Sequence, residues 1–302
     1  MPPTRFRIEL GDGDRRVTIL NRATSSDYPC LAVDWSSGLV GWYGTPDAKV
    51  SLTERQTSDG AHEVPDDQVL YAARTVTVGV VAFGDGRSQV LAQQALVGSL
   101  SGRTVRVRVV DATSDTYAYG YATCKWDGER NYLLPYQQGT LTIVCPDPRR
   151  LATEPSDAWL LPAQAHGGGV GLSYGASGAG LRYPLDYGAG ATDSRNSATV
   201  RNAGSAPAHP VVTLTGPLDA GATVTVSAGG STASVTIGRA VAGGTSVTVD
   251  FRTRTASQGR LDVTRQVTAT GWAPVPAGGE AACTLQATGT GSALVRVRDT
   301  YI

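Results

Sequence analysis

Several residue types are scarce in this chain, and each scarcity excludes a class of protein. Only two lysines occur, Lys49 and Lys125, and the 26 basic residues are balanced by 26 acidic ones. A chain without net charge has no overall positive field to attract phosphate backbones or anionic lipid. We therefore expect no nucleic-acid partner and no membrane partner.

Long apolar segments are also missing. No stretch approaches the roughly 18 apolar residues that a membrane-spanning helix needs, and the first residues, Met-Pro-Pro-Thr-Arg-Phe-Arg, lack the hydrophobic core of a secretory signal. The sequence predicts neither a signal peptide nor a membrane span. We expect synthesis as a soluble product in the cytoplasm.

Cysteine and histidine are few and scattered. The four cysteines, Cys30, Cys124, Cys145 and Cys283, form no CxxC motif and no close Cys/His pair. This spacing is unlike a zinc site and unlike a disulfide-stapled small domain. We predict reduced, buried thiols, no metal site and no bound cofactor.

The composition that remains is that of a folded, sheet-rich protein. The 302 residues are 41% hydrophobic and 17% charged, with 37 glycines and 16 prolines. These values exclude intrinsic disorder and indicate many turns. The length favours two domains, with one large β-domain as the alternative.

The first half combines strands with one helix. Period-two alternation predicts an opening hairpin over 6–20 and further strands around 76–80, 105–109, 115–126 and 138–145. Between them, residues 87–103 show four-residue steps that predict a helix. We expect Ser88 to cap its start, Gly102 its end, and Leu91, Leu96 and Leu100 to form its apolar positions.

The second half has a purely β rhythm. Short alternations recur about every dozen residues and show no helical period, which favours an all-β jelly-roll sandwich. They centre on Val211/Leu214, Val224/Val226, Val235/Ile237, Val247/Val249/Phe251, Leu261/Val263, Cys283/Leu285 and Leu294/Val295/Val297. The predicted fold class is mainly β, an N-terminal α+β sandwich or barrel with one helix followed by a C-terminal sandwich.

A proline pair sets the expected boundary between the halves. Pro146 and Pro148 lack backbone N–H groups, so a central strand cannot continue through them. We predict a hinge over 145–155, with material of the next domain beginning at Trp159. The expected domains are 1–148, a linker and start of the second domain over 149–198, and 199–302.

No catalytic site survives a test of the motifs. His166–Gly169 and the following Gly171–Gly175 resemble an oxyanion segment and a G-x-S-x-G nucleophile elbow around Ser173. A hydrolase places these on separate strand–helix turns, whereas here they are nearly contiguous and no helix pattern follows. We predict that the chain is not an enzyme and has no catalytic residues.

For the remaining candidate residues, structural or solvent-exposed roles are favoured over catalysis or ligand binding. His62 and His209 each stand alone and are expected in exposed loops. The Asp66-Asp67 pair lacks calcium-loop spacing and indicates a turn or cap. Trp35 and Trp42 could line a sugar platform, although core or interface anchoring is the more frequent use of tryptophan.

Three stretches together resemble the Dit-like distal tail proteins of siphophages, whose C-terminal domain is galectin-like. The matching stretches are Tyr132–Ala152 with its Pro-Asp-Pro-Arg signature, Val200–Ala220 with Asn202, Gly204, Ala208, Pro210 and Gly216-Pro217, and Val249–Ile302 with Trp272, Pro274, Pro276 and Gly278. The stretch from Val76 to Leu100 fits the strand and helix of the ring-forming domain. The first seventy residues match poorly.

This resemblance implies a structural virion protein at the distal end of a phage tail, made in the host cytoplasm. N-terminal domains would form a hexameric ring that joins the tail tube protein to the tail-tip, or tail-associated, hub protein. C-terminal domains would face neighbouring baseplate components, a receptor-binding protein among them. No catalytic, cofactor or metal residue follows from it.

Other function classes remain open. A carbohydrate-binding or receptor-binding baseplate module requires aromatic and polar residues on one sheet face of 199–302, where the aromatic residues are Phe251, Trp272 and Tyr301. A hydrolase requires an activity that Ser173→Ala abolishes. A tail-tube subunit is a further structural alternative, disfavoured by the second domain.

Overall fold

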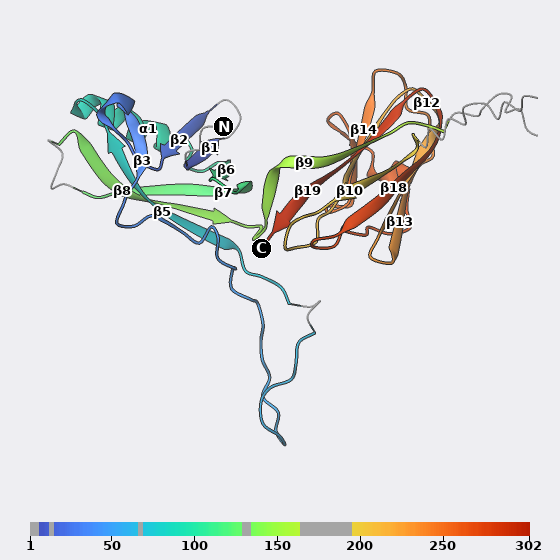
Figure 1. Ribbon diagram of the computed structural model, residues 1–302, viewed down its shortest axis with the longest axis horizontal. Helices are drawn as coiled ribbons and strands as arrows, with labels where there is room; N and C mark the ends of the chain where they lie inside the picture. The colour runs from blue at the N-terminus through green and yellow to red at the C-terminus, as the bar shows by residue number, and fades with distance from the viewer. Residues whose placement is uncertain (1–5, 12–14, 66–68, 129–133, 164–194) are drawn as a thin grey trace, which may run out of the picture. The chain divides into compact units, whose positions relative to one another are not determined.

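The computed structural model describes residues 6–11, 15–65, 69–128, 134–163 and 195–302 (Figure 1). The chain divides into two compact units. The first unit is Met1–Glu154 with Thr300–Ile302, and the second is Pro155–Asp299. Two strands, β9 (Arg150–Leu160) and β19 (Ser292–Tyr301), contribute residues to both units.

The first unit is a closed barrel of seven strands in the order β1-β2-β3-β5-β8-β7-β6, with β6 returning to β1. All neighbours are antiparallel except β2 and β3. The strands are β1 (Arg7–Gly11), β2 (Arg16–Leu20), β3 (Cys30–Val33), β5 (Arg74–Phe83), β6 (Thr104–Val110), β7 (Asp115–Trp126) and β8 (Tyr136–Cys145), while β4 (Leu39–Val40) pairs with β5 and η1 (Ser25–Asp27) is a 3-10 turn.

Period-two alternation explains the barrel core. Ile8 and Leu10 of β1 are fully buried, as are Val76, Val78 and Val80 of β5. Closure removes the free sheet edges that an open sheet would present to other chains. The predicted hairpin and the predicted strands of the first half are confirmed.

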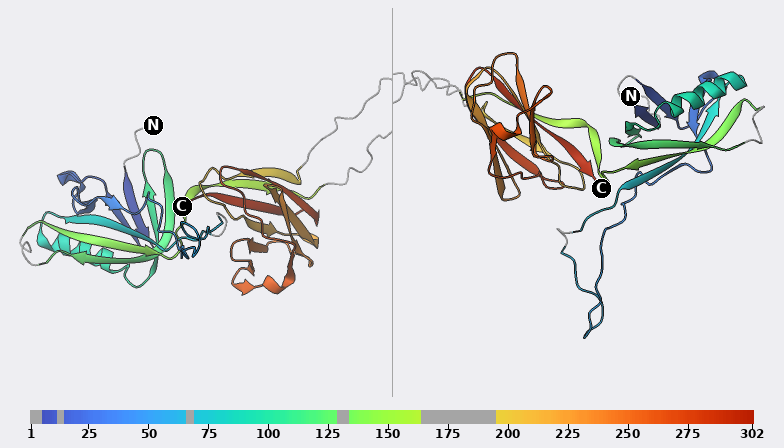
Figure 2. Two further views of the ribbon diagram at one scale, coloured as in Figure 1. Left: turned by 90° about the horizontal axis from the view of Figure 1, so that it is seen from below. Right: turned by 180° about the vertical axis from the view of Figure 1, so that it is seen from behind.

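The predicted helix is present, but of its predicted apolar positions only Leu100, just after the helix, is buried, and its caps are Gly86 and Ser99 rather than Ser88 and Gly102. Helix α1 (Arg87–Gly98) begins after Gly86 and contacts β5, β7 and β8 on one side of the barrel (Figure 2). Val90 and Val97 point to the core, whereas Leu91 and Leu96 are each 48% exposed. Val90 and Val97 are seven residues apart, two helical turns, and so share one face.

Strand β8 stops pairing with β7 just before the two prolines, as predicted, and β9 pairs with β7 after them. β8 pairs with β7 as far as Val144 opposite Tyr121, and β9 pairs with the same strand from Leu151 opposite Tyr117. The hinge predicted over 145–155 is therefore wrong in its second half, because Arg150 begins a strand that also includes Pro155. Leu160 lies in the core of the second unit, as the assignment of the material after Trp159 predicts.

The second unit is a sandwich of two sheets around one apolar core, as the β rhythm predicts. One sheet has the order β10-β18-β12-β13-β17, and the other includes β16-β15-β14-β11-β19. The strands are β10 (Ser197–Arg201), β11 (Val211–Thr215), β12 (Leu218–Ala228), β13 (Ser231–Ile237), β14 (Ser246–Asp250), β15 (Thr255–Gln258), β16 (Leu261–Asp262), β17 (Val267–Ala269) and β18 (Glu280–Gly289), with a 3-10 turn η4 (Thr264–Gln266).

A buried asparagine joins two of the stretches singled out in the sequence. Asn202 is fully buried, and its Nδ2 donates to the carbonyl oxygens of Ala206, Val275 and Pro276 at 2.8, 3.2 and 3.0 Å. Its Oδ1 accepts from the backbone N–H of Gly204 at 3.0 Å. The Asn-x-Gly spacing thus supplies a structural clamp between the segment before β11 and the segment before β18.

Replacing this amide with a carboxylate tests the clamp. Asn202→Asp turns a donor into an acceptor that faces three carbonyl oxygens, so we expect the free energy of unfolding of the second unit to fall by about 3 kcal/mol. Chemical denaturation of the whole chain measures this. Gln266→Glu, the same chemical change at an exposed position of η4, should change it by less than about 0.5 kcal/mol. Equal losses in both variants would contradict the clamp.

Candidate assembly surfaces

Within the part of the chain that the structure describes, the candidate catalytic and metal-binding residues do not come together. Among the described residues no cluster of three His, Cys, Asp or Glu side chains could hold a metal ion. His62 is exposed, as predicted, whereas His209 is partly buried rather than exposed. The Ser173 motif over 166–180 and the Asp66-Asp67 pair lie outside the described residues. No helix in the described part of the chain is long and apolar enough to span a membrane.

The aromatic residues singled out in the sequence do not form a sugar platform. Trp42 is fully buried, as core anchoring predicts, and Trp35 is 98% exposed, so the two do not share a surface. In the second unit, Phe251 is buried and meets Trp272 edge-to-face at 5.3 Å. Tyr301 belongs to the first unit. The aromatic face that the carbohydrate alternative requires is therefore not assembled by these residues.

Paired hydroxyls occupy one face of β12 and β13 instead. Thr223 and Thr236 lie 2.9 Å apart, and Thr225 and Ser234 also 2.9 Å apart, oxygen to oxygen. These directly opposed pairs stabilise the sheet.

The predicted burial of the cysteines holds for two of the four. Cys145 and Cys283 are buried, and Cys30 and Cys124 are half-buried. Burial raises the pKa of Cys124, Cys145 and Cys283 to about 11. Because the thiolate is the reactive form, these side chains are inert at neutral pH.

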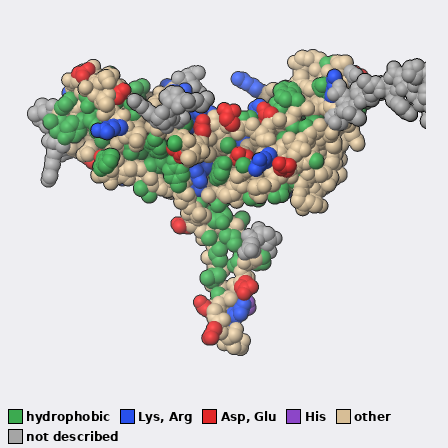
Figure 3. All heavy atoms as spheres, in the orientation of Figure 1, with side chains coloured by type: hydrophobic (Ala, Val, Ile, Leu, Met, Phe, Trp, Pro, Cys, Tyr) green, Lys and Arg blue, Asp and Glu red, His purple; other side chains and the backbone are tan. Residues whose placement is uncertain are grey.

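Residues 45–65 and 69–73, named here the arm, extend away from the barrel between β4 and β5 (Figure 1). The two sides of the arm are joined at intervals, for example by the N–H of Lys49 to the carbonyl of Leu70 at 2.6 Å and the N–H of His62 to that of Thr53 at 2.9 Å. Leu52 and Leu70 are each 64% exposed. Figure 3 shows hydrophobic side chains along the arm, which is an uncommon exposure for a monomer.

The base of the arm is held by one buried guanidinium. Arg74 is 1% exposed, and its Nη1 donates to the carbonyl oxygens of Gly41, Trp42 and Gly44 at 2.7, 2.8 and 2.7 Å. Its Nε donates to the carbonyl of Pro148 at 2.8 Å. Burial, together with the nearby charge of Arg150, lowers the pKa of Arg74 to about 10.

Gly41 makes this cradle possible. Its φ is +84°, in the region that favours glycine, and a Cβ there would collide with the carbonyl oxygen of Thr75. Beside the cradle, the guanidinium of Arg150 lies 5.8 Å from the ring centroid of Trp42 and 5.7 Å from that of Tyr43. The start of the arm, the start of β5 and the start of β9 therefore meet at one point.

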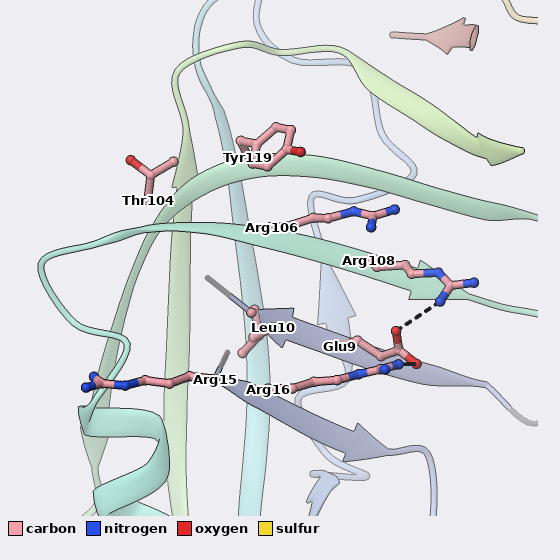
Figure 4. Close-up of a pocket in the computed structure, with 9 residues that line it drawn as sticks. Glu9, Leu10, Arg15, Arg16, Thr104, Arg106, Arg108 and Tyr119 are labelled. Carbon is pink, nitrogen blue, oxygen red and sulfur yellow. Dashed lines mark hydrogen bonds and ion pairs between the residues drawn. The ribbon is translucent and has the colours of Figure 1, made fainter. Parts of the chain in front are cut away.

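The outer face of β2, β1, β6 and β7 carries a second charged cluster (Figure 4). Glu9 is 7% exposed and lies between three arginines. Arg7, Arg16 and Arg108 approach its carboxylate oxygens at 2.7, 2.5 and 3.1 Å. Arg108 also donates through Nε to Asp115 at 2.8 Å. Cross-strand pairs of opposite charge thus join neighbouring strands.

These ion pairs shift the titration of both acids. Burial alone would raise the pKa of Glu9, but hydrogen bonds from Arg7 and Arg16 and the charge of Arg108 bring it below its usual 4.5. The hydrogen bond from Arg108 lowers the pKa of Asp115. Both acids are therefore ionised at neutral pH.

Apolar surface is exposed on α1 and beside β3. Leu91, Ala92, Ala95 and Leu96, named here the α1 stripe, are all exposed and have no charged residue among them. Trp35 lies at a hollow of about 660 Å³. Contiguous exposed apolar side chains mark interaction sites.

Arg74 gives one test of this arrangement. In Arg74→Met the carbonyl oxygens of the cradle lose their donors, so we expect the free energy of unfolding of the first unit to fall by about 3 kcal/mol and protease cleavage near the arm's base to accelerate. Arg74→Lys keeps the charge but cannot reach the same four oxygens. Arg22→Met, at an exposed position, is the control, and a loss in Arg22→Met equal to that in Arg74→Met would contradict the role of Arg74.

Glu9 gives a pH-dependent test. A carboxylate whose folded pKa is lowered contributes stability above its unfolded pKa, here 4.5, and loses that contribution as pH falls through the folded value. We expect Glu9→Gln to lower the free energy of unfolding by about 1–3 kcal/mol at pH 7 and by progressively less below pH 4.5. Urea titrations from pH 7 to 3 measure this. Glu63→Gln on the exposed arm should show no such trend, and a difference for Glu9→Gln that does not change with pH would contradict the prediction.

Comparison with known proteins gives a fold. No family model and no curated protein matches the sequence. Among solved structures, the Dit protein of phage SPP1 matches with a TM-score of 0.58 at 14% identity, over 98% of this chain and 99% of that chain. It is described as a paradigm of the hub adsorption apparatus of phages that infect Gram-positive bacteria.

The baseplate of phage P2 supplies two further matches. Its activated conformation with Ca matches with a TM-score of 0.53 at 8% identity, over 97% of this chain and 98% of that chain. The form with Sr gives 0.55 at 8% identity, over 97% of each. This chain therefore shares, along nearly its whole length, the fold of the SPP1 Dit protein and of a chain of the P2 baseplate.

Proposed function

We propose that this chain is a structural subunit of a phage tail hub, a Dit-like distal tail protein located in the virion. The observation that carries the proposal is the fold similarity to the SPP1 Dit protein over 98% of this chain. The similarity extends over both units and not over the barrel alone, which supports the assignment to hub and baseplate proteins.

The hub subunit assembles as a hexameric ring through its first unit. The α1 stripe and the arm are two different exposed surfaces that carry apolar side chains, among them Leu96 and Leu52. Contact between different surfaces on successive copies is heterologous, and it closes into a ring when the rotation between copies allows it. The barrel has no open edge to extend, so side chains and the arm provide the contacts.

The ring joins the tail tube protein on one side to the tail-tip hub protein on the other. Domain 199–302 faces neighbouring baseplate components, including a receptor-binding protein. The role is scaffolding rather than catalysis, since the thiols are held in their unreactive form by burial and the histidines stand apart from one another in sequence. Direct sugar binding by this domain is disfavoured by the burial of Phe251.

Ring assembly is measured by mass photometry and negative-stain imaging of the purified chain. We expect particles of six times the 31.3 kDa chain mass and images of six-membered rings. Leu91→Glu combined with Leu96→Glu places two charges in the α1 stripe and should weaken assembly at least about tenfold, because each buried unpaired charge costs several kcal/mol.

Leu261→Glu in the second unit is the matched control, since Leu261 is 69% exposed and lies far along the chain from α1. It should leave the rings intact. A wild-type chain that stays monomeric at millimolar concentration, alone and with tail tubes added, would refute the hub assignment. Rings that persist in the double α1 variant would refute the role of the stripe.

A further inference from the structure

An aromatic hollow lies on the outer face of the barrel beside Trp35. Phe83 of β5 points outward, because Ala82 before it belongs to the core and side chains alternate along a strand. The ring of Phe83 stacks on that of Tyr28 with centroids 5.3 Å apart and lies 6.3 Å from the ring of Tyr136. Phe83, Tyr136 and Trp35 line a hollow of about 660 Å³.

The turn that carries Trp35 is fixed to the barrel. The backbone N–H of Asp34 donates to the carbonyl of Gly79 at 2.7 Å, and the N–H of Gly79 donates to the carbonyl of Gly38 at 3.0 Å. A Cβ on Gly79 would lie 2.5 Å from the Cβ of Ser37, so this glycine lets the turn lie over the outer face of β5. Trp35 is nonetheless 98% exposed. A large aromatic side chain held in the open by a fixed turn is typical of a binding surface.

The hollow lies close to the point where the described chain begins. The backbone N–H of Asn21 donates to the carbonyl oxygen of Phe6 at 3.3 Å, and both Asn21 and Arg22 line the hollow. Residues 1–5, Met-Pro-Pro-Thr-Arg, precede Phe6 and lie outside the described residues. Five extended residues span roughly 17 Å, whereas β3 is two strands, about 10 Å, from β1. The segment before Phe6 is therefore long enough to cross the hollow.

We propose that the segment Pro2–Arg5, named here the strap, lies across this hollow in the same chain, with its prolines against Trp35 and Tyr136. Proline fixes φ, and a residue before proline is biased towards extended conformations, so this sequence favours polyproline II. Aromatic-lined grooves recognise that conformation. The described lining contains one acid, Asp34, and one base, Arg22, so it has no net charge for the two prolines to compensate.

The attachment of the strap favours its own chain as the source. Phe6 holds the segment beside the hollow, and a short connection gives an effective concentration in the millimolar range. Residues 129–133 also lie outside the described residues and shortly precede Tyr136. The N–H of Asp127 donates to the carbonyl of Gln138 at 2.9 Å and closes that connection at its base. Because its two ends are held together, it is less suited to cross the hollow than residues 1–5.

The strap braces the shortest seam of the barrel. β2 and β3 pair at two positions, Ile19 with Leu31 and Leu20 with Ala32, and each of the other ladders of the described barrel is longer. A segment that runs from β1 past the end of β2 to the turn after β3 joins the strands on the two sides of this seam. The prolines suit this role because they lose less conformational entropy on ordering than other residues do.

The test uses the full chain labelled with 5-fluorotryptophan, with the Trp35 resonance assigned from Trp35→Phe. Fluorine NMR with a soluble, neutral gadolinium chelate measures how closely solvent approaches each indole, and Trp159, which is 64% exposed, is the internal reference. In the wild type we expect weaker relaxation of Trp35 than of Trp159. Pro2→Gly combined with Pro3→Gly should raise the relaxation of Trp35 at least about twofold, because the proline rings no longer cover the indole. Pro65→Gly, at an exposed position of the arm, should leave it unchanged.

Amide hydrogen exchange in β2 and β3 is a second readout. We expect faster exchange in the double glycine variant than in Pro65→Gly, and equal exchange would refute the brace. A Trp35 indole as open as that of Trp159 in the wild type would overturn the strap. Protection of Trp35 that survives in the double glycine variant would overturn it too and assign the hollow to another occupant. Protection that is lost on dilution would assign the segment to a second copy and refute its attachment within one chain.

Discussion

One buried cation organises the first unit. Arg74 has four backbone carbonyl partners, and no carboxylate is among them. Arginine suits this task because its charge is delocalised, weakly hydrated and spread over five donors in one plane. The carbonyls come from Gly41, Trp42 and Gly44, just before the arm, and from Pro148, which lies 74 residues after Arg74 in the chain. The barrel, the base of the arm and the segment that leads into β9 are therefore joined by a single set of hydrogen bonds.

The prolines at 146 and 148 and the guanidinium of Arg74 together fix the course of the chain between β8 and β9. Pro146 and Pro148 remove N–H donors and stop the pairing of β8 at Cys145. A proline keeps its carbonyl, however, and the carbonyl of Pro148 is taken up by Arg74 Nε. The chain is thus fixed through the interruption, and pairing along β7 resumes with β9. The bend at the two prolines is therefore held in place rather than a flexible hinge. The hinge prediction considered the missing N–H donors of the prolines but not the carbonyl oxygen of Pro148, which still accepts a hydrogen bond.

The sequence predicts what depends on local pattern and misses what depends on distant partners. Long alternating strands such as β7 and β5 are identified because both faces of a strand leave a period-two trace. β9 is missed because Arg150, Glu154 and Pro155 hide its alternation, and its ladder partner lies more than thirty residues away. The α1 error has a similar origin: Leu91 and Leu96 look like core residues, but Val90 and Val97 face the barrel. The sequence of the arm shows no strand or helix period. The side chain that anchors its base, Arg74, follows the arm in sequence and has no local pattern that would reveal its partners.

Net charge was the least informative quantity for locating a site. Equal numbers of acids and bases exclude a global field, yet a sum over the chain says nothing about positions across a sheet. Strand register places Arg16 and Arg106 on either side of Gly11, while Glu9 of the same strand engages Arg16 and Arg108. Those residues are nearly a hundred positions apart in sequence, so only the closure of β6 onto β1 makes them neighbours. A protein without net charge can therefore still gather charged side chains on one face of a sheet.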